Sequence, residues 1–333
     1  MKQKVIIIGN GFDIDLGLPT RYSDFVESSI FENLLETNEL CQYLYERYRE
    51  CNWVDIEIEL KDFVEISQDE NRYYSDYVEL KKALSVYLSG IDLQKINRDS
   101  FAYNMIVKYA FEGLRTVKQS SISILNFNYT NSVNYVIDDY FFKTPSIINC
   151  LGTMPYFSKH IHGNIHKNNI ILGVEDCAEI PLEYHFIKKS YDKSYRAYKN
   201  LLLTCDELIV FGHSMGETDD SFFRPFFRRQ LIGKASPKKV CIYFKGDDGY
   251  INLLNRLDSL TEFQLNMFRE YNTLDFIDID NYTPTFKENL ADSLDALTCI
   301  IKGFKEIGKA LKGTPLDSIV KRLSYNDKKR KEI

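Results

Sequence analysis

Short runs of apolar and β-branched residues recur along the chain, and longer stretches with helical periodicity separate them. These runs predict β-strands at Val5–Ile8, Ser121–Leu125, Ser146–Cys150, Ile170–Val174, Glu207–Phe211 and Lys239–Phe244. Strands that alternate with helices are typical of a mostly parallel sheet with right-handed crossovers. The pattern therefore predicts an α/β fold.

The helical pattern between the first two predicted strands is too long for one crossover. Residues 22–66 and 73–117 are mostly helical in pattern, although the alternation in residues 54–60 leaves a strand as the competing interpretation for that piece. We therefore predict a large helical insertion at residues 27–118.

The rest of the chain predicts a core and an extension. The core would consist of residues 1–26 and 119–260 and would include a helix at 182–203. Residues 261–333 predict a mostly helical C-terminal extension with a basic tail.

Composition excludes several classes of protein. Hydrophobic residues make up 44% and charged residues 27% of the 333-residue chain, as in globular proteins with a real core. The net charge of −6 argues against nucleic acid as a partner. Seven dispersed cysteines with no Cys-x-x-Cys predict neither a disulfide framework nor a structural zinc. We see no secretory leader and no apolar run near the roughly 20 residues that span a bilayer, so we expect a cytoplasmic protein with no membrane partner.

Three polar loops directly follow predicted strands, at Gly9–Asp13, Asn126–Asn131 and Gly212–Asp219. Ligands of parallel sheets bind beyond the carboxyl ends of the strands. Each loop alone is ordinary turn chemistry, but together they predict a ligand site.

The first of these loops has a Gly-x-Gly that does not fit a dehydrogenase. Gly9 and Gly11 permit a close approach of backbone N–H groups to a ligand, and a following helix would favour phosphate. The common dinucleotide fingerprint needs a third glycine where Ile14 stands, and the next glycine is Gly17. A tight turn with no ligand is the alternative interpretation.

The ordered motifs resemble those of the sirtuin superfamily. The similar segments are Gly9–Pro19, Asn126–Thr130, His162-Gly163 and Gly212–Met215. A narrower set resembles the bacteriophage abortive-infection family AbiH: Ile8–Asp13, Gly17–Thr20, Tyr22–Phe25, Trp53 with Glu57, Asn126–Thr130, His162-Gly163 and Gly212–Ser214.

These resemblances imply a sirtuin-like, Rossmann-type parallel sheet and a role in antiviral defence. They also imply that NAD is bound as a substrate and often hydrolysed. Thr20-Arg21-Tyr22 departs from the Asp-Phe-Arg of sirtuins, and the sirtuin zinc module is absent, so hydrolysis is expected rather than deacylation.

Candidate site residues follow from the motifs. His162 would orient or deprotonate the attacking hydroxyl, and Asn128 would hold water or a ribose hydroxyl; the alternatives are a structural histidine and a turn residue. Asp13 would bind ribose or cap a helix. The residues expected to contact NAD are Gly9, Asn10, Gly11, Phe12, Asp13, Arg21, Asn126, Gly212 and Ser214.

Two other patterns carry less weight. His160, His162 and His166 share a face if extended, but no carboxylate pattern accompanies them, so no metal is expected. Gly212–Gly216 mimics a Gly-x-Ser-x-Gly nucleophile elbow, but no histidine follows His213, so the triad order fails.

The sequence thus predicts an abortive-infection effector that hydrolyses the nicotinamide–ribose bond of NAD. The alternatives are a catalytically silent NAD or ADP-ribose sensor and, more weakly, a metal-dependent nuclease or nucleotide hydrolase. A phage-derived trigger is an expected partner, and the insertion is a candidate pocket cover or homo-oligomer interface.

Overall fold

The computed structural model describes residues 2–52, 55–116, 120–142, 158–189, 198–231 and 235–281. The chain divides into two compact units, residues 1–135 with 156–282, and residues 136–155 with 283–333. The second unit is described only at residues 136–142, which belong to α8 (Ser132–Phe142). The predicted strand at Ser146–Cys150, Trp53 and residues 282–333 of the predicted extension lie outside the described residues.

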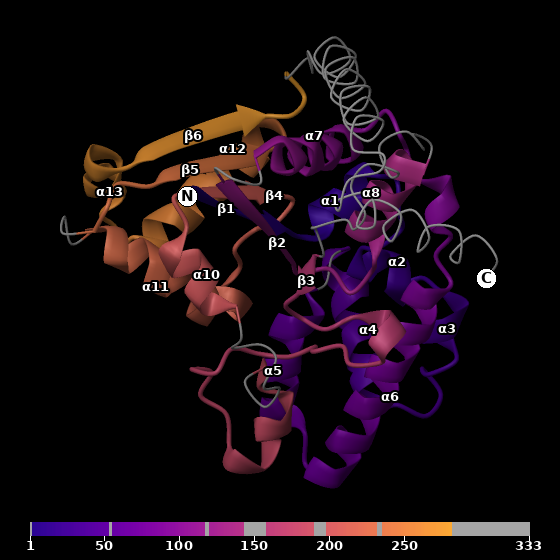
Figure 1. The fold of residues 1–333 in the computed structure, drawn as a ribbon. Coiled ribbons are helices and arrows are strands. Elements are labelled where there is room, and N and C mark those ends of the chain that lie inside the picture. Colours follow the sequence, from indigo (N-terminus) through magenta and orange to yellow (C-terminus); the bar gives the residue numbers. More distant parts are fainter. Residues whose placement is uncertain are drawn as a thin grey trace, which may run out of the picture. The chain divides into compact units, whose positions relative to one another are not determined.

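The first unit is built on a six-stranded parallel sheet (Figure 1). The order is β3-β2-β1-β4-β5-β6. The strands are β1 (Lys2–Ile8), β2 (Ser120–Asn126), β3 (Lys159–His160), β4 (Glu207–Phe211), β5 (Lys239–Phe244) and β6 (Thr273–Asp278). Central β1 is fully apolar and buried from Val5 to Ile8 because neighbouring strands and helices enclose it on all sides. The sheet confirms the predicted α/β class.

The sheet extends past the core boundary predicted at residue 260. Strand β6 lies at the sheet edge, where its residues from Leu274 onward are only half-buried and Asp275 interrupts the apolar run. A half-exposed edge strand needs no continuous apolar sequence, so the pattern gave no strand there.

Two other predicted elements differ. Residues 170–174 form no strand of the sheet; Val174 makes a single bridge to Lys188. The helix predicted over 182–203 is interrupted: the 3₁₀ helix η3 (Leu182–Ile187) ends at an extended Lys188, and α10 (Lys199–Thr204) follows after residues 190–197, which lie outside the described residues. The apolar residues of 170–174 and 182–203 pack against the insertion's core or the sheet. Their spacing along the chain therefore resembles that of a buried strand and of an amphipathic helix.

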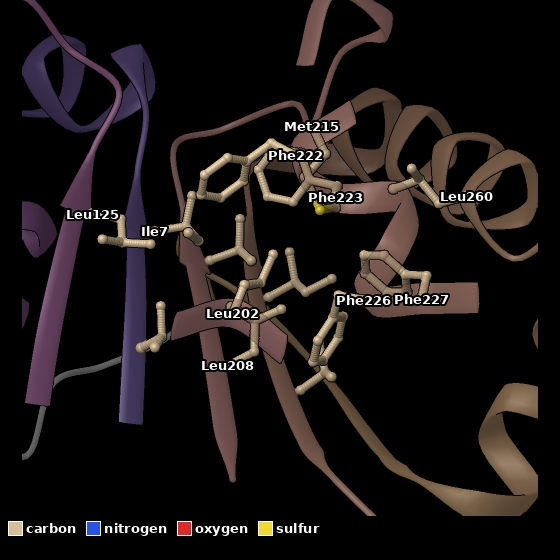
Figure 2. Packing of buried hydrophobic residues seen from close by; sticks show 14 of the residues in the cluster. Ile7, Leu125, Leu202, Leu208, Met215, Phe222, Phe223, Phe226, Phe227 and Leu260 are labelled. Atoms are coloured by element: carbon tan, nitrogen blue, oxygen red, sulfur yellow. The ribbon is translucent and has the colours of Figure 1, made fainter. Parts of the chain in front are cut away.

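One face of the sheet is covered by α10, α11 (Asp220–Leu231), α12 (Gly246–Leu260) and α13 (Leu265–Tyr271). Side chains alternate along each strand, so Val5 and Ile7 point to this face and Ile6 and Ile8 to the other. Four phenylalanines of α11 fill this layer (Figure 2). Each buried side chain of this size contributes about 1.5–3 kcal/mol.

The other face packs against α1 (Asn10–Asp15) and α7 (Phe101–Thr116). The ring of Phe211 in β4 meets Phe12 edge-on at 6.0 Å and stacks on Phe101 at 5.6 Å. Helix α7 fell within the insertion predicted at residues 27–118, but it packs against β2 and belongs with the sheet.

The remaining insertion has its own core. It comprises α3 (Ser29–Glu32), α4 (Glu39–Cys51), α5 (Ile56–Ile66) and α6 (Glu70–Ser89), with the short η1 (Leu93–Lys95) after it. Helix α2 (Tyr22–Val26), which the prediction assigned to the core, packs with these helices, so the insertion begins before residue 27. Asn38, Asp55 and Asp69 cap α4, α5 and α6 by accepting backbone N–H bonds. Because Asp55 caps a helix, residues 56–60 are helical and do not form the strand that their alternating pattern had offered as an alternative. Among the described helices, none is both long and apolar enough to cross a membrane.

Candidate functional site

A cavity of about 390 Å³ lies where the loops after β1, β2 and β4 meet the insertion. The sheet side contributes Gly9, Asn10 and Asp13, residues 127–130, His162, residues 212–214 and residues 216–219. The insertion side contributes residues 20–22, Phe25, Asp55, Glu57, Ile58, Leu84, Tyr87 and Leu88. The three polar loops singled out in the sequence therefore line one cavity.

The glycines of the first and third loops are needed because the two backbones touch. Gly9 N–H donates to Phe211 O at 3.0 Å, and Gly11 N–H donates to Gly212 O at 2.8 Å. A Cβ on Gly9 would lie 2.5 Å from Gly212 O, and one on Gly11 would lie 2.7 Å from Gly212 Cα. Gly212 itself has φ +65°. The Gly-x-Gly thus joins two loops, and these two N–H groups bond to protein carbonyls.

Asp13 joins the first loop to the second. Its fully buried carboxylate accepts hydrogen bonds from the hydroxyls of Thr130 and Ser132. Burial raises the pKa of Asp13 to about 6, against the opposing hydrogen bonds from Ser132, Thr130 and Asn128. Asn126 supports the same loop, since its Oδ1 accepts from Asn128 N–H at 3.0 Å.

His162 lies at the cavity wall just after β3. Its Nε2 is 2.9 Å from Asp219 Oδ1, and its ring meets Phe127 edge-on at 5.0 Å. Gly163 follows with φ +77°, and a Cβ there would lie 1.9 Å from Asn169 O. The His-Gly pair is therefore fixed by backbone geometry as well as by the Asp219 contact.

Asp219 is the centre of a buried polar network. Besides His162, its carboxylate contacts Lys189 Nζ at 2.9 Å and His213 Nε2 at 3.5 Å. Lys189 is fully buried and also bonds Glu57 Oε2 at 2.8 Å and Thr218 O at 2.9 Å. The network thus connects helix α5 of the insertion to the loop after β4.

Charge pairing decides the ionisation of the network. Burial opposes the charge on Asp219, but Lys189 and His162 outweigh it and hold the Asp219 pKa well below its usual range. Burial likewise opposes the charge on Lys189, and the carboxylates of Asp219 and Glu57 outweigh it and raise the Lys189 pKa. Both groups are therefore charged at neutral pH.

His213 is held neutral in one tautomer. Its Nδ1 accepts the Met215 backbone N–H at 2.8 Å, so the ring proton must sit on Nε2, facing Asp219. Burial lowers its pKa against the pull of Asp219.

The structure brings eight of the predicted site residues to the cavity. These are His162, Asn128, Gly9, Asn10, Asp13, Arg21, Gly212 and Ser214. Gly11, Phe12 and Asn126 do not line it: Gly11 packs on the β4 loop, Phe12 on Phe211, and Asn126 supports its own turn. Asn10 also bonds Thr20, through Oδ1 to the hydroxyl and through Nδ2 to the carbonyl, and so holds the segment that contains Arg21.

The sequence reasoning did not assign Asp219, Lys189 or Glu57 to the site. Asp219 is the last residue of the predicted polar loop Gly212–Asp219, so the sequence indicated its position but not its role. Lys189 gave no signal because a fully buried lysine is rare. Its partner Glu57 is 132 residues away in sequence.

The three neighbouring histidines do not converge. His160 bonds Asn128 O through Nδ1 and Asn164 through Nε2, and burial lowers its pKa. His166 is exposed on η2 (Ile165–Lys167). Within the described ranges, no group of three His, Cys, Asp or Glu side chains is arranged to hold a metal ion.

Comparison with known proteins places these residues in one family. The family model described as bacteriophage abortive infection AbiH matches residues 5–237, a range that covers more than half of the chain and every residue of the cavity. No curated protein and no solved structure matches significantly. The family description indicates a role in abortive infection of bacteriophage. The chain therefore belongs to the bacteriophage abortive infection family AbiH.

Proposed function

We propose that this protein is an abortive-infection effector that binds NAD in the cavity and hydrolyses its nicotinamide–ribose bond. The observation that carries the proposal is the buried His162–Asp219 pair at the wall of a cavity beyond the strand ends. The pair combines an imidazole, which can act as a base, with a carboxylate that orients it.

The topology supports a dinucleotide as the ligand. The strand order 3-2-1-4-5-6 is that of Rossmann-type folds, in which dinucleotides bind where the order reverses. Here that point is between β1 and β4, and the loops after both strands line the cavity. The volume of about 390 Å³ lies in the range of small-molecule sites. This agrees with the sirtuin-like character inferred from the motifs.

The chemistry follows from the charges at the cavity wall. Cleavage of the bond to nicotinamide passes through an oxocarbenium-like state, in which positive charge develops on the ribose. Around His162, the single ammonium of Lys189 stands against the two carboxylates of Asp219 and Glu57, so the site favours that positive charge.

We assign His162 the role of general base. If Nε2 donates to Asp219, Nδ1 is the basic ring nitrogen and would take the proton from the attacking water. Nicotinamide leaves as a neutral molecule, and the water oxygen forms the new bond to ribose C1′.

Other cavity residues suit the parts of NAD. The buried amide nitrogen of Asn128 makes no hydrogen bond of good geometry to a described residue, although it lies close enough to Asp13 to oppose the rise in that group's pKa. It would hold a ribose hydroxyl or the water. Arg21 and Ser214 would meet the phosphates.

The test is nicotinamide release from NAD by the purified full-length protein. We expect turnover by the wild type and a loss of about 100-fold or more in His162→Ala, the range of a lost general base. His166→Ala, four residues away and exposed, is the matched control. No turnover, with or without lysate of phage-infected cells as a source of trigger, would contradict the enzyme proposal.

A second candidate is a sensor that binds NAD or ADP-ribose without hydrolysis. It is favoured by the departure at Thr20–Tyr22 from the sirtuin motif. Calorimetric binding without nicotinamide release would support the sensor, and no binding of either nucleotide would exclude it.

If the protein hydrolyses NAD, its activity must be controlled. Unrestrained NAD hydrolysis would kill the host cell, so we propose that a phage-derived trigger or a change of assembly activates the protein in the cytoplasm.

A further inference from the structure

A buried carboxylate oxygen at the cavity wall has no donor. Glu57 lies in the first turn of α5, and its backbone N–H bonds the capping Asp55 side chain at 3.0 Å, which fixes its position. Its Oε2 accepts from Lys189, while Oε1 is buried and accepts no hydrogen bond from any described residue. An ionised carboxylate can only accept, and buried polar atoms are normally paired. A hydrogen-bond donor is therefore expected at Oε1.

Among the described residues, the groups around Glu57 do not supply that donor. Three tyrosines lie within electrostatic reach of it. Tyr77 donates its hydroxyl to Leu172 O at 2.6 Å, and Tyr129 donates to Ile171 O at 3.1 Å. The Tyr22 hydroxyl lies near that of Tyr129 and makes no hydrogen bond to Glu57 Oε1. Since Glu57 lines the cavity and no described residue donates to its Oε1, a molecule bound in the cavity could supply the donor.

Glu57 is also close to His162. Lys189 Nζ bonds both Glu57 Oε2, at 2.8 Å, and Asp219 Oδ1, at 2.9 Å, and the same Asp219 oxygen bonds His162 at 2.9 Å. A group that bonds Glu57 is therefore linked to the proposed base through the side chains of Lys189 and Asp219.

We propose that Glu57 binds the ligand, its Oε1 accepting a hydrogen bond from a hydroxyl of the ribose whose C1′ faces His162. The inference rests on the proposed NAD site and extends it, because the helical insertion then supplies part of the substrate contact. Recognition through this carboxylate selects ribonucleotides over ligands that lack the hydroxyl.

Wild-type protein alone gives the first test. Calorimetry would compare ADP-ribose, which has no nicotinamide to lose, with its 2-deoxy and 3-deoxy derivatives at the terminal ribose. We expect one of the two deoxy ligands to bind about 10- to 100-fold more weakly, the effect of a lost hydrogen bond to a charged group. Equal binding of all three would overturn the role of Glu57 and leave the NAD site standing. No binding of ADP-ribose or NAD would overturn both.

Substitution gives the second test. In Glu57→Gln we expect weaker binding of ADP-ribose and loss of the discrimination against the deoxy ligand, a ratio that a purely structural role would leave intact. The control is Glu59→Gln on the same helix, a buried carboxylate that bonds Tyr43 and Arg47 and does not line the cavity. Discrimination retained in Glu57→Gln would contradict the proposal.

Discussion

The two walls of the cavity are stabilised by different kinds of interaction. On the sheet side, the loops after β1 and β4 meet backbone to backbone, and glycines allow the contact. On the insertion side, α5 is tied to the sheet loops by the buried ion pairs of Lys189 with Glu57 and Asp219. The first wall depends on close backbone packing and the second on the balance of buried charges. Added side-chain volume should therefore destabilise the first wall, and loss of a charge should destabilise the second.

The largest expected effect is on the charged wall. Lys189→Met leaves two buried carboxylates without their cation, and we expect a loss of about 3–5 kcal/mol in the free energy of unfolding. Denaturant unfolding would measure it. Adding Glu57→Gln removes one of the two carboxylates, so the double variant should lose less than the sum of the single losses. An additive result would mean that the two charges do not act as a unit.

The glycine wall is tested by a pair of positive-φ glycines. Gly212→Ala places a Cβ 2.4 Å from Phe12 N, and we expect a loss of about 2–4 kcal/mol from strain and overpacking. Gly17→Ala is the control, because Gly17 has φ +83° but nothing within 4 Å of its Cβ position, and it should lose only about 1–2 kcal/mol. Equal losses would show that the loop contact adds nothing.

The smallest effect is a pH dependence at Asp13, which joins two loops of the sheet-side wall. Burial raises the folded-state pKa of Asp13 to about 6, above its ordinary value of 3.8. The native state therefore holds this proton more tightly, and the contribution of Asp13 is complete below about pH 4 and is lost as the pH rises through about 6. Between pH 4 and pH 7 we expect the free energy of unfolding of the wild type to fall by about 2–3 kcal/mol relative to that of Asp13→Asn. Parallel stability curves for the two proteins would contradict it.

The same contrast explains what the sequence could predict. The run Val5–Ile8 and the loops Gly9–Asp13 and Gly212–Asp219 are local patterns, and they were sufficient to predict the parallel sheet and where its cavity lies. Lys189 takes its role from partners 30 and 132 residues away, which no window of sequence contains. Strand β6 was missed for a related reason, since an edge strand is defined by its neighbour β5 and not by its own apolarity.

Some predicted residues reached their positions for other reasons than those expected. Gly11 and Asn126 have clear structural roles in loop contact and turn formation. His162 and Asn128 do line the cavity. A motif marks where a backbone must be unusual, but only packing separates the side chains that face a ligand from those that support them.

The span of the Lys189 network has a consequence for synthesis of the chain. Its members come from residues 57, 162, 189 and 219, and β1 has β4 as one of its two partners in the sheet. Contacts so distant in sequence are absent until the later segments have been synthesised. A nascent chain that comprises only the insertion and β2 has no complete site. For the proposed effector, chains that end before residue 219 would therefore be harmless to the cell that makes them.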